Sequence, residues 1–458
     1  MVKELSGSKL KRMWKIPAGV LLLLIGLVAG GRALAQEEGR PEVVVLEASG
    51  PVVPPLSNYI ERGLQKADER NAEVVILVLD TPGGNVNVTL EIIQAIRTSD
   101  IPVVVYVGPR GARAASAGLL ITLAGHAAAM APDTAIGASS PVGPQGQDLD
   151  QTAQEKAEEY LSAEARSLAE RRGEEAVAVA NAAVQEARAV SAREALDAGL
   201  VDFIAEDVND LLDQLDGTEV EVGGRPRTLH TRNAILIPIP MSEVERALLI
   251  LTDPNIVFLL LSIGITAIIV EIRSPGGWVA GTVGTICLGL ALYGLGVLPV
   301  NWLGLVFIVL AFVLFILEIK APTHGALAAA AIISMIAGAI ILFSQPELAP
   351  FGHLSIPLVV GQSLAIGAIF VFLLTMAIRA QSLPPTTGYE GLIGQRGRVT
   401  RDLDPRGMVL VRGEYWQAES LSGEPVPAGS EVEVVRAERM RLWVRPVAGT
   451  LSPEDRAR

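Results

Sequence analysis

Ser116 lies in a setting that suits a catalytic nucleophile. It stands among small residues, in the sequence Ala114-Ala115-Ser116-Ala117-Gly118, where an apolar helical pattern begins. A helix N-terminus offers unpaired N–H groups and positive potential, which favour a nucleophile that faces a developing oxyanion. A serine that caps the helix or fills a packing position would show the same pattern. Ser116 by itself therefore leaves both interpretations open.

A second loop, Asp80-Thr81-Pro82-Gly83-Gly84, could supply groups that stabilise an oxyanion. Paired glycines tolerate positive φ angles and leave backbone N–H groups exposed. Such N–H groups can form an oxyanion hole. An ordinary tight turn would have the same composition, so this loop is a weak signal when taken alone.

A serine nucleophile also needs a base nearby. His126 is the only histidine between residues 36 and 229. Ten residues of continuous helix would place it about 15 Å from Ser116 along the axis, which is too far for proton transfer. A Ser–His pair is therefore not expected.

Lysine is the other candidate base, because arginine stays protonated whereas a desolvated lysine can be neutral. Residues 36–252 contain two lysines, Lys66 and Lys156. Lys66 lies beside acidic residues on a polar helix face, which is typical of a surface charge. Lys156 begins a helical run after the loop 141–147. Its glutamate neighbours favour the charged form, so Lys156 could act as a base only if it turns into a cleft.

The elements that must position these residues alternate between strand and helix. Apolar β-rich runs at 43–46, 74–79 and 102–107 are separated by helical patterns at 56–70 and 90–97. This alternation predicts an α/β fold with a mostly parallel sheet. Ligands in such folds bind at the carboxyl ends of the strands, which is where both loops lie.

The region 241–380 reads as a bundle of about five membrane-spanning helices. Half of the 458 residues are hydrophobic and the mean hydropathy is +0.42, so long apolar stretches are expected. A span needs roughly 20 apolar residues. The candidate segments are 254–271, 278–298, 302–319, 324–344 and 355–378. No internal repeat stands out.

Basic residues flank these segments on alternate sides. Arg273, Lys320 and Arg379 follow the first, third and fifth segments, and the other two loops carry no basic residue. The positive-inside rule then places residue 253 outside and the C-terminal domain in the cytoplasm. The chain is thus expected to be a multi-pass protein of the cell membrane, in contact with membrane lipid.

The N-terminus agrees with this topology. Basic residues precede an apolar run, 16–29, and the small-x-small pattern Ala33-Leu34-Ala35 follows. This predicts a signal peptide over 1–35 that is cleaved before Gln36. The alternative is an uncleaved anchor helix. Either one sends residues 36–252 across the membrane.

Composition argues against several classes of ligand. Cys287 is the only cysteine and the four histidines are scattered, so neither a disulfide within the chain nor a metal site is expected, and no cofactor is indicated. Residues 36–252 carry 17 Lys and Arg against 34 Asp and Glu, which argues against nucleic acid as a partner.

Residues 385–448 show short alternating runs punctuated by glycine, which predicts a small five-stranded barrel. Residues 383–458 carry 11 basic and 11 acidic residues, without a basic stripe. A role in protein interaction is therefore favoured over nucleic-acid binding.

Several motifs together resemble the long form of the NfeD family. The family comprises membrane-anchored serine proteases of the Clp/crotonase fold, similar also to signal peptide peptidase A. The motifs are Asp80-Thr81-Pro82-Gly83-Gly84, Ala115-Ser116-Ala117-Gly118, Met130-Ala131-Pro132, Ile136-Gly137-Ala138 and the stretch 191–202. In the last of these, Ser191 and Glu194 form a capping box.

The resemblance implies a Ser–Lys dyad. Ser116 matches the nucleophile and Lys156 the base, with Tyr160 four residues further on as in the family pattern. The backbone N–H groups of Gly84 and Ala117 would form the oxyanion hole. The loop before Lys156 is about one residue shorter than the family pattern.

The resemblance also implies a Clp/crotonase-like domain over 36–240 and an OB-like C-terminal barrel. Pro141 or a near neighbour stands where Clp proteases place their histidine, which argues against a Ser–His–Asp triad. Expected substrates are extended apolar peptide segments. Expected partners are a stomatin-like membrane protein, in membrane-protein quality control, and at least one further copy of the chain.

Two other functions compete with a protease. One is a non-catalytic membrane scaffold that recruits partners through the barrel. The other is an acyl-CoA enzyme on the same fold, which export disfavours because acyl-CoA is cytoplasmic.

Overall fold

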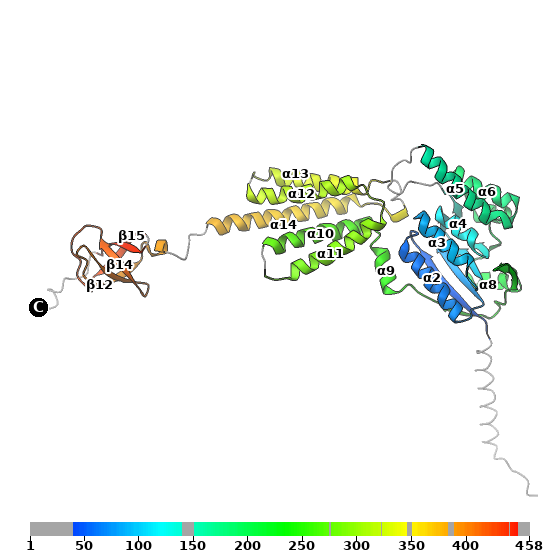
Figure 1. Ribbon diagram of the computed structural model, residues 1–458, viewed down its shortest axis with the longest axis horizontal. Coiled ribbons are helices and arrows are strands. Elements are labelled where there is room, and N and C mark those ends of the chain that lie inside the picture. Colours follow the sequence, from blue (N-terminus) through cyan, green and yellow to red (C-terminus); the bar gives the residue numbers. More distant parts are fainter. Residues whose placement is uncertain are drawn as a thin grey trace, which may run out of the picture. The chain divides into compact units, whose positions relative to one another are not determined.

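The computed structural model describes residues 40–139, 151–273, 276–321, 323–345, 350–382, 389–438 and 440–447. The predicted signal peptide lies outside these residues. The chain divides into two compact units, Met1–Phe370 and Val371–Arg458, and the boundary in the sequence falls within the last apolar helix. Figure 1 shows the α/β domain, the helical bundle and the barrel along the chain.

The N-terminal domain is built on a six-stranded sheet in which every neighbouring pair is parallel. The central strands are buried on both faces and are rich in valine, as parallel strands covered on both sides usually are. The strand order is β11 (Ile235–Pro238), β1 (Glu42–Ser49), β2 (Val74–Asp80), β3 (Val103–Val107), β5 (Ala127–Met130) and β8 (Phe203–Ile204).

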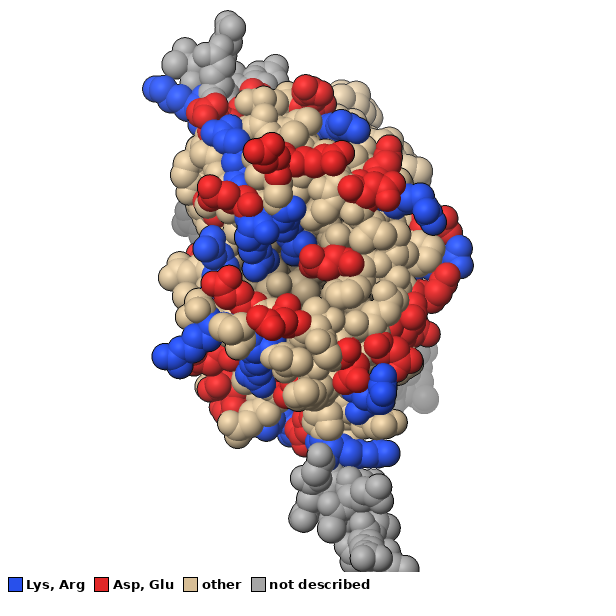
Figure 2. All heavy atoms as spheres, turned by 90° about the vertical axis from the view of Figure 1, so that its right-hand side faces the viewer, with Lys and Arg blue, Asp and Glu red and all other residues tan. Residues whose placement is uncertain are grey.

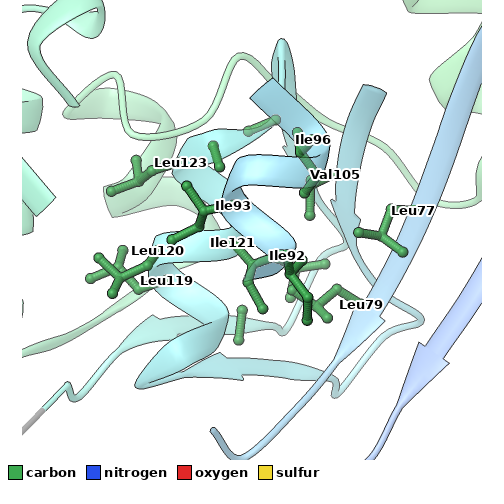
Figure 3. Packing of buried hydrophobic residues seen from close by; sticks show 14 of the residues in the cluster. Leu77, Leu79, Ile92, Ile93, Ile96, Val105, Leu119, Leu120, Ile121 and Leu123 are labelled. Atoms are coloured by element: carbon green, nitrogen blue, oxygen red, sulfur yellow. The ribbon is translucent and has the colours of Figure 1, made fainter. Parts of the chain in front are cut away.

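Amphipathic and apolar helices cover one face of this sheet. In α2 (Pro54–Glu69), Leu56, Tyr59, Ile60 and other residues at helical spacing are buried. All eight residues of α4 (Ala117–Ala124) are buried. Figure 3 shows Ile121 of α4 beside isoleucines of α3 (Val86–Arg97), which lie next to leucines of β2. A rigid apolar core therefore fixes the helix whose N-terminus carries Ser116.

The other elements of the domain enclose this core. A three-stranded sheet of β4 (Arg113–Ala115), β6 (Ala135–Gly137) and β7 (Ala189–Ser191) lies beside the first. β9 (Glu219–Val222) and β10 (Arg225–Thr228) form an antiparallel hairpin. The remaining helices of the domain are α5 (Gln151–Ala169), η1 (Glu170–Arg172), α6 (Glu174–Gln185), α7 (Ala192–Asp197), α8 (Val208–Leu215) and α9 (Glu243–Ile250). Figure 2 shows acidic and basic side chains interspersed over one face of this domain.

Five apolar helices form the bundle. They are α10 (Pro254–Arg273), α11 (Val279–Val297), α12 (Trp302–Lys320), α13 (Ala326–Leu342) and α14 (Ile356–Ser382). Within the described residues, four of them, α10, α11, α12 and α14, are long and apolar enough to cross a membrane, and α13 is shorter at 17 residues. Each of the five helices overlaps one of the segments predicted from the sequence. That all five cross the membrane remains a prediction.

The C-terminal unit contains a closed barrel of order β12-β13-β14-β16-β15. Its interior is filled mostly by valines of alternating strand positions, such as Val409 and Val411. The strands are β12 (Arg396–Arg401), β13 (Arg406–Val411), β14 (Glu414–Ser420), β15 (Glu431–Glu438) and β16 (Arg441–Pro446), preceded by the short helix η3 (Tyr389–Leu392). The three-part fold class predicted from the sequence is confirmed.

Candidate active site

Ser116 occupies a strained turn between β4 and α4. Its backbone has φ 53° and ψ −113°, a conformation that non-glycine residues rarely adopt. Its N–H donates to the carbonyl oxygen of Gly137 at 2.8 Å, and its own carbonyl accepts from the N–H of Leu119 at 3.0 Å. The hydroxyl forms no cap hydrogen bond with α4. The interpretation as a capping serine is therefore wrong, and the hydroxyl is available for chemistry.

The loop after β2 is hydrogen-bonded to the segment that carries Ser116. Thr81 N–H donates to Arg113 carbonyl oxygen at 2.7 Å, and Ala115 N–H donates to Thr81 carbonyl oxygen at 3.0 Å. The side chain of Asp80 accepts from the N–H of Arg113 at 3.1 Å. These contacts bring the two loops found in the sequence into one site.

Within this loop, Gly83 lies directly against Ser116. A Cβ built on Gly83 would lie 2.8 Å from Ser116 Cβ and 3.2 Å from Oγ, and Gly83 has φ +108°. The buried hydroxyl of Thr81 accepts the Gly83 N–H at 3.1 Å. Thr81 thus orders the loop, a role that sequence reasoning missed although its hydroxyl stands beside the paired glycines.

The backbone of Val52 fixes Gly84 from the other side. Val52 N–H donates to Gly83 carbonyl oxygen at 2.8 Å, and Val52 carbonyl accepts from Asn85 N–H at 2.9 Å. In this parallel bridge the N–H of Gly84 points away from Val52. A Cβ on Gly84 would lie 2.3 Å from Val52 carbonyl oxygen, so only glycine fits there.

Two backbone donors beside Ser116 are unused. Among the described residues, the N–H groups of Gly84 and Ala117 have no hydrogen-bond partner. Ala117 is the first residue of α4, where a helix leaves its N–H groups without intrahelical partners. The arrangement offers a hydroxyl and two free N–H groups, which is what acyl transfer through an oxyanion needs.

Lys156 lies near the start of α5 with an exposed side chain. Within the described part of the chain, no hydrogen bond joins it to Ser116. Tyr160, one turn later on α5, is also exposed. Residues 140–150, which contain Pro141, lie outside the described residues. The structure thus brings together Ser116, Gly84 and Ala117, and it does not join Lys156 to them.

His126 has a structural role. The helix that begins after Ser116 ends at Ala124, and His126 lies beyond it, just before β5. Its Nδ1 accepts the N–H of Val103 at 3.0 Å. Burial, with the nearby Arg171, lowers the pKa of His126 to about 4, so the ring is neutral near pH 7. Among the described residues, no group of three metal-ligating side chains is arranged to hold a metal ion.

The fold and the site define a class of membrane protein in which an α/β domain presents a serine at a buried helix N-terminus, ahead of an apolar bundle and a β-barrel. Three family models match the chain: the NfeD1b N-terminal domain over 42–223, the NfeD integral membrane domain over 255–376, and the NfeD-like C-terminal, partner-binding domain over 389–446. The chain belongs to the NfeD family.

Two relatives extend over most of the chain. It is 36% identical over 412 residues to the membrane-bound protease PH1510 of Pyrococcus horikoshii, covering 88% of this chain and 92% of that protein. It is 26% identical over 456 residues to the membrane protein NfeD1b of Bacillus subtilis, covering 93% of this chain and 97% of that protein.

Solved structures resemble the N-terminal domain. One is a lysine-to-alanine mutant of 1510-N, a membrane-bound stomatin-specific protease, in complex with a substrate peptide. It is 32% identical, covers 45% of this chain and 96% of that one, and has a TM-score of 0.42. Another is 1510-N from P. horikoshii, a membrane protease specific for a stomatin homolog. It is 32% identical, covers 47% of this chain and 100% of that one, and has a TM-score of 0.41.

Proposed function

We propose that this chain is a membrane-anchored serine endopeptidase in which Ser116 is the nucleophile and Lys156 the base. The observation that carries the proposal is the geometry at Ser116. Ser116 carries an uncapped hydroxyl on a strained turn against Gly83, and the next residue of each segment, Gly84 and Ala117, has a backbone N–H without a partner among the described residues. The relationship to a membrane-bound protease, 36% identical over nearly the whole chain, supports the same reaction class.

The proposed reaction uses these residues as follows. Neutral Lys156 takes the proton from Ser116 Oγ, and Oγ attacks the carbonyl carbon of a peptide bond. The N–H groups of Gly84 and Ala117 hold the oxyanion. The Lys156 ammonium then protonates the leaving amine, and water hydrolyses the acyl-enzyme by the reverse sequence of proton transfers. Because Lys156 is exposed in the free protein, the bound peptide must cover it and exclude water for the neutral amine to be favoured.

The substrate and partner follow from the family. We propose extended apolar peptide segments as substrates and a stomatin-like membrane protein as partner, in membrane-protein quality control. The P. horikoshii relative is named as specific for a stomatin homolog, and the family model of the C-terminal domain describes it as partner-binding. The protease domain would lie outside the cytoplasm and the barrel inside it, so a reporter fused after Arg379 should be cytoplasmic.

The decisive experiment is covalent labelling by a fluorophosphonate probe. The wild-type chain should be labelled at Ser116, and Ser116→Ala should lose both labelling and peptide cleavage. Ser167→Ala, at an exposed position on α5, is the matched control and should behave like wild type. Cleavage by Ser116→Ala at the wild-type rate would refute the assignment, and a folded wild-type protein that neither labels nor cleaves would favour the non-catalytic scaffold.

A further inference from the structure

The apolar bundle contains a duplicated hairpin that the sequence analysis missed. Glu271-Ile272-Arg273-Ser274-Pro275 at the end of α10 recurs 47 residues later as Glu318-Ile319-Lys320-Ala321-Pro322 at the end of α12. The same offset relates the ends of α10 and α12 and the starts of α11 and α13. The repeat is hard to detect in the sequence because few other positions of the two hairpins carry the same residue type. The hairpins α10–α11 and α12–α13 are therefore two copies of one unit.

The two hairpins share their turn chemistry. The carboxylate of Glu271 accepts the backbone N–H groups of Gly276 and Trp278, and that of Glu318 accepts those of Thr323 and Gly325, at the equivalent positions. The helix that follows each turn begins after a residue in the left-handed region, Trp278 or Gly325. Such close agreement makes residue-by-residue comparison of the two hairpins meaningful.

Helix α14 covers the second hairpin at a defined place. Phe370 stacks on Phe315 of α12 with ring centroids 4.7 Å apart. A Cβ on Gly367 would lie 2.7 Å from Ile332 of α13, so α14 approaches this hairpin closely. Figure 1 shows α14 lying beside α12. Phe315, under this helix, is fully buried.

No described residue covers the equivalent place on the first hairpin. The counterparts of Phe315 and Ile332 are Ile268 and Thr285, and both line a hollow of about 450 Å³ between α10 and α11. The other lining residues are Glu271, Ile272, Trp278, Gly281, Thr282 and Ile286. The hydroxyls of Thr282 and Thr285 and the carboxylate of Glu271 are already hydrogen-bonded to backbone groups. The hollow therefore fits an apolar helix.

The same hairpin carries two glycines that do not stand at close contacts between helices of the described chain. A Cβ on Gly289 or Gly296 of α11 would meet nothing within 4 Å. Other glycines of the bundle stand at close contacts between helices, among them Gly264, Gly284, Gly294, Gly304, Gly338 and Gly367. Glycine in a helix costs about 1 kcal/mol relative to alanine, and contact with lipid does not require it. Gly289 and Gly296 are what a second helix needs for close approach.

We propose that the α10–α11 hairpin is the surface through which two copies of this chain associate within the membrane. The α10–α11 hairpin carries both the hollow and the glycines that face outward. In a dimer with a two-fold axis, each copy can therefore place a helix against the hollow and the glycines of the other copy. The internal repeat indicates that a helix is the right occupant, because the second hairpin already holds one at the equivalent place. This association does not depend on the chemistry proposed for Ser116.

Cysteine crosslinking in native membranes tests the proposal. With Cys287 replaced by serine, Ile286→Cys places a thiol at the rim of the hollow, and Ile333→Cys places one at the repeat-equivalent position of the second hairpin. The two side chains are similarly exposed, 57% and 67%, which makes them matched. Ile286→Cys should crosslink into a dimer of the chain, and Ile333→Cys should not. Equal crosslinking of both, no dimer from Ile286→Cys, or a crosslink to a different protein would overturn the proposal.

A second pair of variants tests the glycines in the full chain. Gly289→Leu should abolish the Ile286→Cys crosslink, because the side chain blocks the approach of the second copy. Ala330→Leu, at an exposed position of α13, is the control and should leave the crosslink unchanged. Both positions are exposed in the single chain, so folding should persist in both variants. A crosslink that survives Gly289→Leu would contradict the interface.

Discussion

Gly83 faces Ser116 so closely that a side chain on Gly83 would collide with it, and the absence of a Cβ on Gly83 is what allows Ser116 to keep its conformation. A methyl group there would lie 2.8 Å from Ser116 Cβ, closer than real Cβ contacts. Ser116 is held from the opposite side by the hydrogen bond to Gly137. Ser116 therefore cannot move away from Gly83 without losing the hydrogen bond from its backbone N–H to Gly137.

We predict that Gly83→Ala abolishes most of the acylation by a fluorophosphonate probe while the protein still folds. The clash moves Oγ away from the N–H groups of Gly84 and Ala117, and loss of one oxyanion donor alone typically lowers the rate by about 10²–10³. Gly111→Ala is the matched control. It also has a positive φ, +83°, but a Cβ there meets nothing within 4 Å. Similar acylation rates in both variants would contradict the role of this contact.

Replacement of Lys156 tests the base separately from the nucleophile. Lys156→Arg keeps the charge but removes the ability to accept a proton, so peptide cleavage should fall by about 10²–10⁴. A small primary amine added to Lys156→Ala should restore part of the activity. Lys66→Ala, on the exposed face of α2, should cleave like wild type. Full activity of Lys156→Arg would exclude Lys156 as the base.

Much of the architecture was predictable because it depends on local patterns. The apolar runs before Asp80 and Gly108 are strands β2 and β3. The capping box of Ser191 and Glu194 is present as predicted, with both hydrogen bonds formed. The glycine-punctuated C-terminal sequence is a closed barrel. In each case, the residues that determine the structure are neighbours in the sequence.

The site depends on contacts that no local pattern contains. Val52 is 32 residues from Gly84, and Gly137 is 21 residues from Ser116, yet their backbones fix the oxyanion loop and the nucleophile. The positive φ of Ser116 is imposed by these contacts and is unfavourable for serine itself. The distance from Ser116 to His126 was estimated for a continuous helix, but α4 ends at Ala124 and Gly125 has extended backbone angles.

His126 should make the N-terminal domain sensitive to moderate acid. Its pKa is lowered from 6.5 to about 4 in the folded protein, chiefly by burial. The unfolded chain binds the proton more readily, so the contribution of His126 to stability is constant above pH 6.5 and falls as the pH drops from 6.5 towards 4. Thermal unfolding of the full chain in detergent should show this loss. His126→Asn, which keeps an acceptor for Val103 N–H, should flatten the profile between these values, and His230→Asn, at an exposed position, should not. A profile unchanged in His126→Asn would assign the acid sensitivity to other groups.

Glu245 should hold α9, the last helix before α10, against α2. Its carboxylate receives two hydrogen bonds from Arg62, at 2.8 and 2.7 Å, and accepts the N–H of Ser242 at 2.7 Å. The hydrogen bond from Arg62 is the main cause that lowers the pKa of Glu245 to about 2. The stabilisation is therefore present above the ordinary glutamate pKa, about 4.5, and is lost as the pH falls towards 2.

Glu245→Gln should consequently lower the protection of α9 amides against hydrogen exchange at pH 7, by a factor that corresponds to about 1 kcal/mol for a charge-assisted pair that is partly exposed. The difference from wild type should shrink as the pH is lowered from 5 to 3, because Glu245 in the opened state of wild type takes up a proton in this range and glutamine cannot. Glu243→Gln is the control on the same helix, since the Glu243 side chain is 87% exposed and its pair with Arg246 is on the surface. In a double-mutant cycle, Arg62→Leu should remove the effect of Glu245→Gln. If both glutamate variants lowered protection equally, the ion pair with Arg62 would not be what holds α9 in place.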